Sequence, residues 1–296
     1  MSKEVVRLGI VGLDGHGSAF AEKVNGRRPA LKGARVVAAI SFPSVMVSRA
    51  VLRDKVEKTR SLGIEIVKSP DALAQRVDGI LILHDDGAQH LALAKLFARF
   101  RKPLFVDKPF EASARKAAAL VALCRSHRTP LFSASSLRFS REIEMVLSDN
   151  AAGPILSAMT YAPYVVRPTM PGWIYYACHA VEPLYTLMGP RCREVRCLMS
   201  PSGPVAVGTW ADGRVGIARA VAKGEHSYGF TVWRKKRTLS ASVRTEFIYA
   251  ELLKRILTFV KTRLSPVPPS ESAETVAFME AANKSMANKG RSTPVA

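Results

Sequence analysis

Cysteine, acidic residues and long apolar runs are scarce in this sequence of 296 residues, and each scarcity excludes a class of protein. Four cysteines form neither a Cys-x-x-Cys pair nor a Cys/His set with zinc spacing: Cys124, Cys178, Cys192 and Cys197. We therefore expect reduced thiols and no metal site. No apolar run approaches the ~18–20 residues that cross a bilayer. The N-terminus has early charges, a short apolar stretch and no cleavage site, which predicts no signal peptide, no membrane partner and a cytoplasmic location.

Acidic residues number 24 against 44 lysines and arginines, which gives a formal net charge of +20. Such an excess is typical of a surface that attracts nucleic acid or acidic lipid, or of a solvated basic surface without a polymeric partner. The densest basic run covers residues 234–237, and the other positive charges are scattered. Because zinc-finger, basic-zipper and RNA-recognition signatures are missing, we expect no specific nucleic-acid partner. Binding of nucleic acid through residues 234–237 stays an alternative.

The hydrophobic fraction of 48% can fill a substantial core, and the length suggests about two domains. Short apolar strands alternate with helical segments over residues 1–134. The expected strands are 7–13, 34–40, 64–67, 79–83, 104–106 and 130–134, and the expected helices are 19–25, 45–62, 70–76, 90–100 and 113–127. Strands that are apolar throughout are typical of a parallel sheet covered on both faces. The pattern predicts an N-terminal doubly wound Rossmann domain over residues 1–134.

The pattern changes over residues 135–296. Expected strands follow one another at 155–166, 194–200, 205–210, 215–221, 228–234 and 238–243, and expected helices follow at 246–263 and 271–288. Short polar or glycine turns between strands are typical of an antiparallel sheet. We predict a C-terminal domain over residues 135–296 with a largely antiparallel, open-faced sheet, so that the whole chain combines an α/β and an α+β domain.

A glycine-rich turn follows the first expected strand, and residues 9–17 have the sequence GIVGLDGHG. A strand, a glycine turn and a helix together are the context of a nucleotide phosphate site, in which backbone amides at the helix N-terminus bind the phosphate. Gly12 and Gly17 occupy the outer positions of the usual G-x-G-x-x-G spacing, but Asp14 occupies the middle one. A carboxylate there would repel a pyrophosphate unless its side chain turns away. An ordinary strand-to-helix turn explains this loop about equally well.

Residues 79–110, with the sequence GILILHDDGAQHLALAKLFARFRKPLFVDKPF, resemble the central part of the Gfo/Idh/MocA oxidoreductase family. Members of this family have a strand, a Thr-Pro-Asn-like turn, a helix led by histidine, and a strand that ends in Glu-Lys-Pro. Here the turn is His84-Asp85-Asp86, the histidine is His90, and the triplet is Asp107-Lys108-Pro109. The resemblance extends through essentially the whole chain and implies the fold predicted above.

The segment YYACHAVEPLYTLMG, residues 175–189, is similar to the family's Asp-x-Gly-x-His-x-x-Asp helix. The family histidine matches His179 and its last acid matches Glu182, while the first acid falls on Tyr175. The resemblance implies that Lys108 contacts substrate and nicotinamide, and that His179 handles the substrate hydroxyl as a general base. Tyr175 then either takes over part of the proton transfer or weakens the chemistry. Glu182 either orients His179 or is a solvated acid.

The resemblance also implies ligands for a dinucleotide. The candidate cofactor-binding residues are Gly12, Leu13, Asp14, Gly15, His16, Gly17, Ser41, His84, His90, Asp107 and Lys108. NAD-binding proteins commonly have an acid at the end of the second strand, where this chain has Ser41 instead. Ser41, Ser44 and Arg49 suit a 2′-phosphate, so NAD or NADP is expected with a lean toward NADP.

Substrate contacts are expected from Arg138, Trp173, Tyr175 and His179. For Arg138 a surface position, and for Trp173 a place in the core, explain the sequence equally well. The predicted function is an NAD(P)-dependent oxidoreductase that transfers a hydride between a nicotinamide and a hydroxyl-bearing carbon of a sugar, cyclitol or similar polyol. The alternatives are a non-catalytic dinucleotide- or sugar-binding member and a redox-neutral enzyme with tightly held NAD. The family further implies that the open sheet face pairs subunits in a homodimer or homotetramer.

Overall fold

The computed structural model describes residues 5–296, which fold into two compact units. Unit 1 comprises residues 5–111, 115–134 and 252–269, and unit 2 comprises residues 112–114, 135–251 and 270–296. Residues 1–4, which begin the expected first domain and carry the N-terminal charges, lie outside the described residues. No helix within residues 5–296 is both long and apolar enough to cross a membrane.

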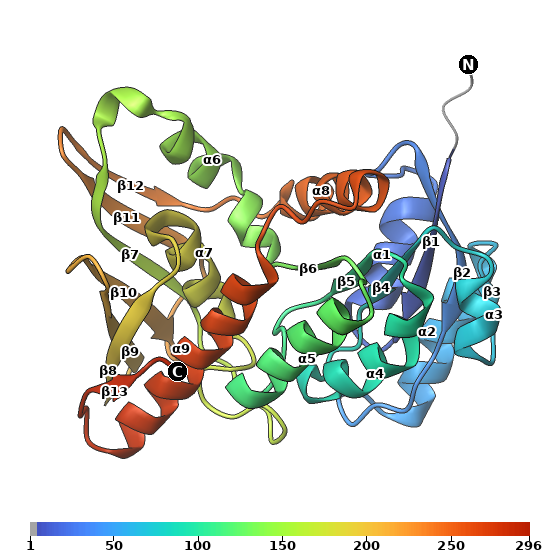
Figure 1. Cartoon of the computed structure of the whole chain (residues 1–296), viewed down its shortest axis with the longest axis horizontal. Helices are drawn as coiled ribbons and strands as arrows, with labels where there is room; N and C mark the ends of the chain where they lie inside the picture. Colours follow the sequence, from blue (N-terminus) through green and yellow to red (C-terminus); the bar gives the residue numbers. More distant parts are fainter. Residues whose placement is uncertain (1–4) are drawn as a thin grey trace. The chain divides into compact units, whose positions relative to one another are not determined.

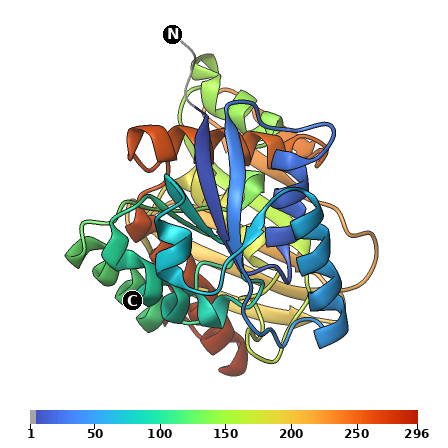
Figure 2. The ribbon, with the colours of Figure 1, turned by 90° about the vertical axis from the view of Figure 1, so that its right-hand side faces the viewer.

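Unit 1 is built on a six-stranded parallel sheet with the strand order β3-β2-β1-β4-β5-β6 (Figure 1). Its strands are β1 Val6–Val11, β2 Ala34–Ile40, β3 Glu65–Ile66, β4 Gly79–Ile82, β5 Leu104–Val106 and β6 Leu131–Ser133. Figure 2 shows β1 and β2 side by side, paired in parallel. Strands β4, β5 and β6 are buried along their whole length, as a sheet covered on both faces requires. The predicted Rossmann fold is confirmed.

Helices cover both faces of this sheet. They are α1 His16–Asn25, α2 Arg49–Ser61, α3 Pro70–Ala74, α4 His90–Phe97 and α5 Ala114–Ser126. Successive residues of a strand point to opposite faces, and in β1 the backbone of Gly9 adjoins Leu73 of α3 while Ile10 adjoins Gly17 of α1. Helix α2 starts four residues later than the expected 45–62 because the Ser48 hydroxyl accepts the N–H of Val51 and caps the helix there.

Most of α8 (Ile248–Thr262), from Leu252 onward, belongs to unit 1, although the sequence pattern assigned everything after residue 134 to a second domain. Val260 fills the space beside Gly79, where a Cβ would come within 2.5 Å of its side chain. The rings of Phe259 and Phe132 meet edge to face with centroids 5.5 Å apart. Apolar packing against β4 and β6 therefore fixes this part of α8 through long-range contacts, which the local periodicity of the sequence does not indicate.

Unit 2 contains a seven-stranded sheet with the order β12-β11-β7-β10-β9-β8-β13. Its strands are β7 Ile155–Pro163, β8 Cys192–Ser200, β9 Gly203–Trp210, β10 Val215–Val221, β11 Gly229–Arg234, β12 Thr238–Ser242 and β13 Thr293–Pro294. Strands β7 and β10 pair in parallel and the other neighbours pair antiparallel. The predicted, largely antiparallel sheet is confirmed.

Helices α7 (Cys178–Met188) and α9 (Pro269–Ala287) pack on one face of this sheet. Thr160 of β7 donates a hydrogen bond to the Ala180 carbonyl of α7, and Ser285 of α9 accepts the N–H of Cys197 in β8. Helix α6 (Arg141–Ser148) was not expected from the sequence. The Ser140 hydroxyl caps its first turn, which also carries Glu142 and Glu144.

Candidate functional site

Three polar loops lie at the carboxyl edge of the unit 1 sheet. Residues 12–15 follow β1, residues 84–86 follow β4, and residues 107–108 follow β5. These strands are direct neighbours in the parallel sheet, so their carboxyl ends meet at one edge. In open α/β sheets this edge is where ligands bind.

The glycine loop packs too closely on its neighbours for side chains. Gly12 has φ +90°, and a Cβ there would lie 2.7 Å from the Cα of His84. A Cβ on Gly17 would lie 1.9 Å from the carbonyl oxygen of Gly12. Helix α1 begins at His16 without a side-chain cap and without an acid in its first turn. Its N-terminal amides therefore keep their capacity to bind an anion, and the loop fits the pyrophosphate of a dinucleotide.

Asp14 occupies the middle position of the loop, but its carboxylate accepts hydrogen bonds inside unit 1, and only 2% of the residue is exposed. The Ser44 hydroxyl donates to its Oδ2 at 2.6 Å, and the backbone N–H of Asp85 donates to its Oδ1 at 3.1 Å. Lys55 donates to the Asp14 backbone carbonyl. The carboxylate thus joins the loops that follow β1, β2 and β4, which answers the concern that it would repel a pyrophosphate.

Two candidate cofactor ligands, His84 and His90, are buried and hold loops together. The Nδ1 of His84 accepts the N–H of Asp86 at 3.2 Å, and its Nε2 lies 3.1 Å from the Pro43 carbonyl. The ring nitrogens of His90 lie 2.8 Å and 3.2 Å from the carbonyls of His84 and Phe110. These histidines support the edge loops from within. Leu13 is fully buried, whereas Ser41 at the end of β2 is half-buried.

His16, the first residue of α1, pairs with Asp107 at the end of β5. Its Nδ1 lies 2.6 Å from Oδ2 of Asp107, whose Oδ1 is buried and lacks a hydrogen-bond partner within residues 5–296. Burial alone would raise the pKa of Asp107, but the charge and hydrogen bond of His16, together with the charge of Lys108, lower it to about 2. Lys108 is itself buried, and a cis peptide bond joins it to Pro109. The carboxylate beside Lys108 therefore stays ionised.

In unit 2, His179 lies in the first turn of α7 among a serine and two tyrosines. The Oγ of Ser135 lies 2.8 Å from its Nδ1. The rings of Tyr176 and Tyr228 meet its imidazole edge to face, with centroids 5.0 Å and 5.8 Å away, and their hydroxyls are 3.0 Å apart. Burial, followed by the hydrogen bond with Tyr176, raises the pKa of Tyr228 well above its ordinary value.

Neither Tyr176 nor Tyr228 was a sequence candidate. Tyr176 follows Tyr175 in the segment 175–189 that resembles the family helix, so the sequence provided an indication of its place beside His179. Tyr228 precedes β11 and reaches His179 only through the pairing of β11 with β7, which carries α7 on its face. No local signal marked it.

Tyr175 precedes α7 and does not share a helical face with His179 and Glu182. Helix α7 begins at Cys178, and the Tyr175 carbonyl accepts the thiol of Cys178 at 3.3 Å. The Arg167 guanidinium lies 5.1 Å from the centroid of the mostly buried Tyr175 ring, a cation–π contact.

Arg138 lies in a buried ion-pair network. Its Nε lies 2.6 Å from Oε2 of Glu182, and its Nη1 lies 2.6 Å from Oε1 of Glu271. Burial lowers the pKa of Arg138, but the two carboxylates outweigh it and raise the value. Neither the surface position nor the solvated acid considered from the sequence occurs, because Arg138 and Glu182 are both buried.

Trp173 is 0% exposed and donates its indole N–H to the Cys197 sulfur at 3.3 Å. The structure of unit 2 therefore favours a place in the core for Trp173 over the substrate contact that was also considered.

Two side chains of the basic run at residues 234–237 bind partners inside unit 2. Arg234 donates to the carbonyls of Gly153 and Val146, and Arg237 lies 3.3 Å from Asp149. Two of the four charges thus have internal partners, which weakens the nucleic-acid alternative.

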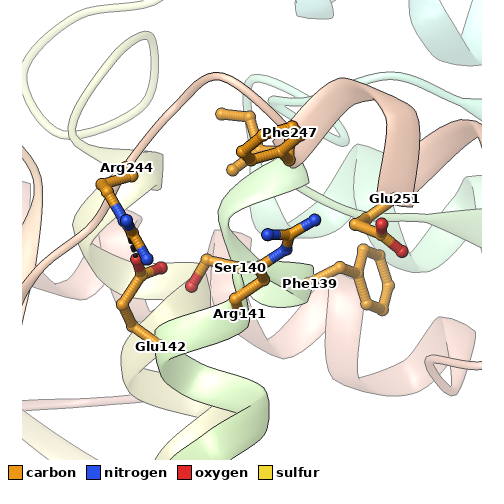
Figure 3. A pocket seen from close by; sticks show the side chains of 8 residues that line it. Phe139, Ser140, Arg141, Glu142, Arg244, Phe247 and Glu251 are labelled. Carbon is orange, nitrogen blue, oxygen red and sulfur yellow. Dashed lines mark hydrogen bonds and ion pairs between the residues drawn. The ribbon is translucent and has the colours of Figure 1, made fainter. Parts of the chain in front are cut away.

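Figure 3 shows a small cavity at the start of α6, where the Arg141 guanidinium lies 4.1 Å from the centroid of the Phe247 ring and Arg244 pairs with Glu142. Its volume of about 10 Å³ admits one water molecule at most. In the part of the chain that the structure describes, no three His, Cys, Asp or Glu side chains are grouped as metal ligands would be.

Comparison with known proteins agrees with this geometry. A family described as "Oxidoreductase family, NAD-binding Rossmann fold" matches residues 6–135. No curated protein matches the sequence.

Solved structures share the fold over nearly the whole chain. Scyllo-inositol dehydrogenase from Lactobacillus casei with bound NAD(H) and scyllo-inositol has a TM-score of 0.78 at 15% identity, covering 99% of both chains. Myo-inositol dehydrogenase from the same organism, in complex with NAD(H) and myo-inositol, has a TM-score of 0.78 at 16% identity, covering 98% of this chain and 96% of that one. GenD2 from gentamicin A biosynthesis, in complex with NAD, has a TM-score of 0.79 at 17% identity with the same coverage.

Proposed function

We propose, from the match of residues 6–135 to the Gfo/Idh/MocA oxidoreductase family, that the protein is an NAD(P)-dependent oxidoreductase that transfers a hydride between a nicotinamide and a hydroxyl-bearing carbon of a sugar, cyclitol or similar polyol. The observation that carries the proposal is the edge of unit 1. There an α1 N-terminus without a side-chain cap lies next to the His16–Asp107 pair and Lys108.

The residues of unit 1 fit a dinucleotide, and the proposal assigns its pyrophosphate to the backbone of residues 12–17. A bound nicotinamide would supply or accept the hydride. No acid follows β2, where NAD-binding proteins commonly hold the ribose diol, and Ser41 and the exposed Arg49 leave room for a 2′-phosphate. Both NAD and NADP are therefore proposed, with a lean toward NADP.

The proposed catalytic residues are Lys108 in unit 1 and His179 in unit 2, with Tyr175 in place of a family carboxylate. Lys108, next to the ionised Asp107, is suited to hold the substrate oxygen and to stabilise negative charge that develops on it. Tyr175 is assigned part of the proton transfer. The rings of Tyr176 and Tyr228 beside His179 suit the apolar face of a sugar or cyclitol, and two of the solved relatives bind inositols.

We also propose a cytoplasmic homodimer or homotetramer that associates through the open face of unit 2. Thr160 of β7 faces α7, so its neighbour Met159 faces the other way. Ile217 lies in register with Met159 and with Val207, which forms a row of partly exposed apolar side chains across three strands. Light scattering should give a mass of two or four chains, and a monomer at micromolar concentration would contradict this assembly.

Calorimetric titration with NAD, NADH, NADP and NADPH tests the function, followed by a panel of sugars and polyols with the preferred nucleotide. Binding of one nucleotide pair and turnover of a polyhydroxylated substrate are expected. Failure to bind any of the four would overturn the proposal. Binding without turnover would favour a non-catalytic member, and NAD that copurifies without net NADH production would favour a redox-neutral enzyme.

A further inference from the structure

We propose that Ser135 holds His179 as the neutral tautomer with its proton on Nε2, so that His179 serves the substrate oxygen as a hydrogen-bond donor. The tautomer follows from contacts inside unit 2, and its catalytic meaning rests on the proposed function. Ser135 is thereby a positioning residue.

The buried hydroxyl of Ser135 has few hydrogen-bond partners within reach. The residue is 0% exposed, and its Oγ accepts the N–H of Leu137 at 3.3 Å. Within residues 5–296, the remaining partner of Oγ is Nδ1 of His179, at 2.8 Å. A serine hydroxyl has one proton to donate, and a buried O–H without an acceptor is costly. The Ser135 O–H therefore donates to Nδ1, which must be unprotonated, so the ring proton of His179 is on Nε2.

Buried groups keep Ser135 in place for this contact. Its backbone N–H donates to Oε2 of Glu182 at 2.7 Å, and the same oxygen accepts from Nε of Arg138 at 2.6 Å. Glu271 holds the other side of the Arg138 guanidinium. Glu182 thus acts on His179 through Ser135, so the orienting role considered from the sequence is indirect.

This tautomer divides the work between the proposed catalytic residues. With a proton on Nε2, His179 has no lone pair there to take a proton from a substrate hydroxyl, but it can donate a hydrogen bond to the substrate oxygen. Proton transfer then falls to the other proposed catalytic residues.

Nitrogen-15 NMR of the protein labelled at its six histidines reads the tautomer directly and needs no substrate. His179→Asn identifies the signals by their loss. His84 provides an internal reference because its Nδ1 accepts a backbone N–H while its Nε2 faces a carbonyl, which requires the same tautomer. A pyridine-type Nδ1 and a pyrrole-type Nε2 are expected for His179, as for His84. A protonated Nδ1 on His179 at neutral pH would overturn the proposal.

Variants of Ser135 separate positioning from packing. Ser135→Thr keeps the hydroxyl and should keep both the tautomer and kcat within about threefold. Ser135→Ala should give mixed tautomers and lower kcat on the order of tenfold with little change in nucleotide binding. An Ala variant that folds and keeps the wild-type histidine signals would overturn the role of Ser135. Absent nucleotide binding in the wild type would refute the proposed function and leave the tautomer result standing.

Discussion

The imidazole of His16 and the carboxylate of Asp107, 2.6 Å apart, connect the first turn of α1 to the residue before Lys108. One end of the pair belongs to the loop proposed for the cofactor phosphates, and the other fixes the segment that carries the proposed catalytic lysine. Anion binding at α1 and the position of Lys108 are therefore physically linked in unit 1.

Asp107→Asn should lower the free energy of unfolding at pH 7 by about 1–3 kcal/mol, because it removes a buried, hydrogen-bonded charge. The pKa of Asp107 in the folded protein is about 2, below the ~3.9 of an unfolded aspartate, so its contribution is present above about pH 4 and is lost as the pH falls toward 2. Urea unfolding at several pH values should show the gap between wild type and variant closing over that range.

Asp212→Asn is the matched control, because Asp212 also pairs with a basic side chain, that of Arg214, but is exposed. It should change stability little at either pH. A gap for Asp107→Asn that stays constant from pH 7 to pH 2.5 would show that the carboxylate charge contributes nothing.

Asp14→Ala should both destabilise unit 1 and weaken nucleotide binding. The variant loses the hydrogen bonds from Ser44 and from the Asp85 backbone, so the loops after β2 and β4 lose their common anchor. Calorimetry and urea unfolding measure the two effects, and Asp54→Ala, an exposed acid on α2, is the control. Tighter nucleotide binding in Asp14→Ala would mean that repulsion by the carboxylate outweighs its anchoring role.

Arg138→Met should cost about 3–5 kcal/mol of stability, because it leaves the buried carboxylate of Glu182 and the partly buried one of Glu271 without their cation. The exposed Arg141 is the matched control, and Arg141→Met should lose only its contact with the Phe247 ring. If Arg138→Met instead keeps full stability and raises only KM, Arg138 contacts substrate as the sequence predicted.

The sequence contained the fold but only part of the site. Apolar runs and turns predicted the parallel sheet because strands buried on both faces, such as β4 and β5, have few polar residues. The loop residues around Gly12 were recognisable because close packing against His84 demands glycine there.

What the sequence lacked is information about partners far along the chain. The pairs Asp14–Ser44, His16–Asp107 and Ser135–His179 span 30, 91 and 44 positions, so nothing local marks them. The assembled sheets and the helices packed on them bring these residues together. From the sequence alone, Asp14 was therefore expected to repel a pyrophosphate, and the role of Glu182 stayed open.

Lys108→Ala should lower turnover on the order of 100-fold or more while nucleotide affinity changes far less, because the lysine acts on the substrate oxygen. Steady-state kinetics and calorimetry separate the two quantities. Lys95→Ala, an exposed lysine on α4, should leave both unchanged. Unchanged turnover in Lys108→Ala would refute the role assigned to this residue.

Tyr175→Phe should alter the pH dependence of kcat/KM, since its phenol is proposed to share the proton transfer that a family carboxylate supports. Tyr228→Phe is the informative companion, because it also removes one hydroxyl from a mostly buried tyrosine, near His179. The raised pKa of Tyr228 keeps that phenol protonated throughout an ordinary assay range, so its loss should leave the shape of the profile unchanged. The loss of its hydrogen bond with Tyr176 should cost about 1 kcal/mol of stability. If instead Tyr228→Phe reshapes the profile and Tyr175→Phe does not, the proton-transfer role passes from Tyr175 to the Tyr176–Tyr228 pair beside His179.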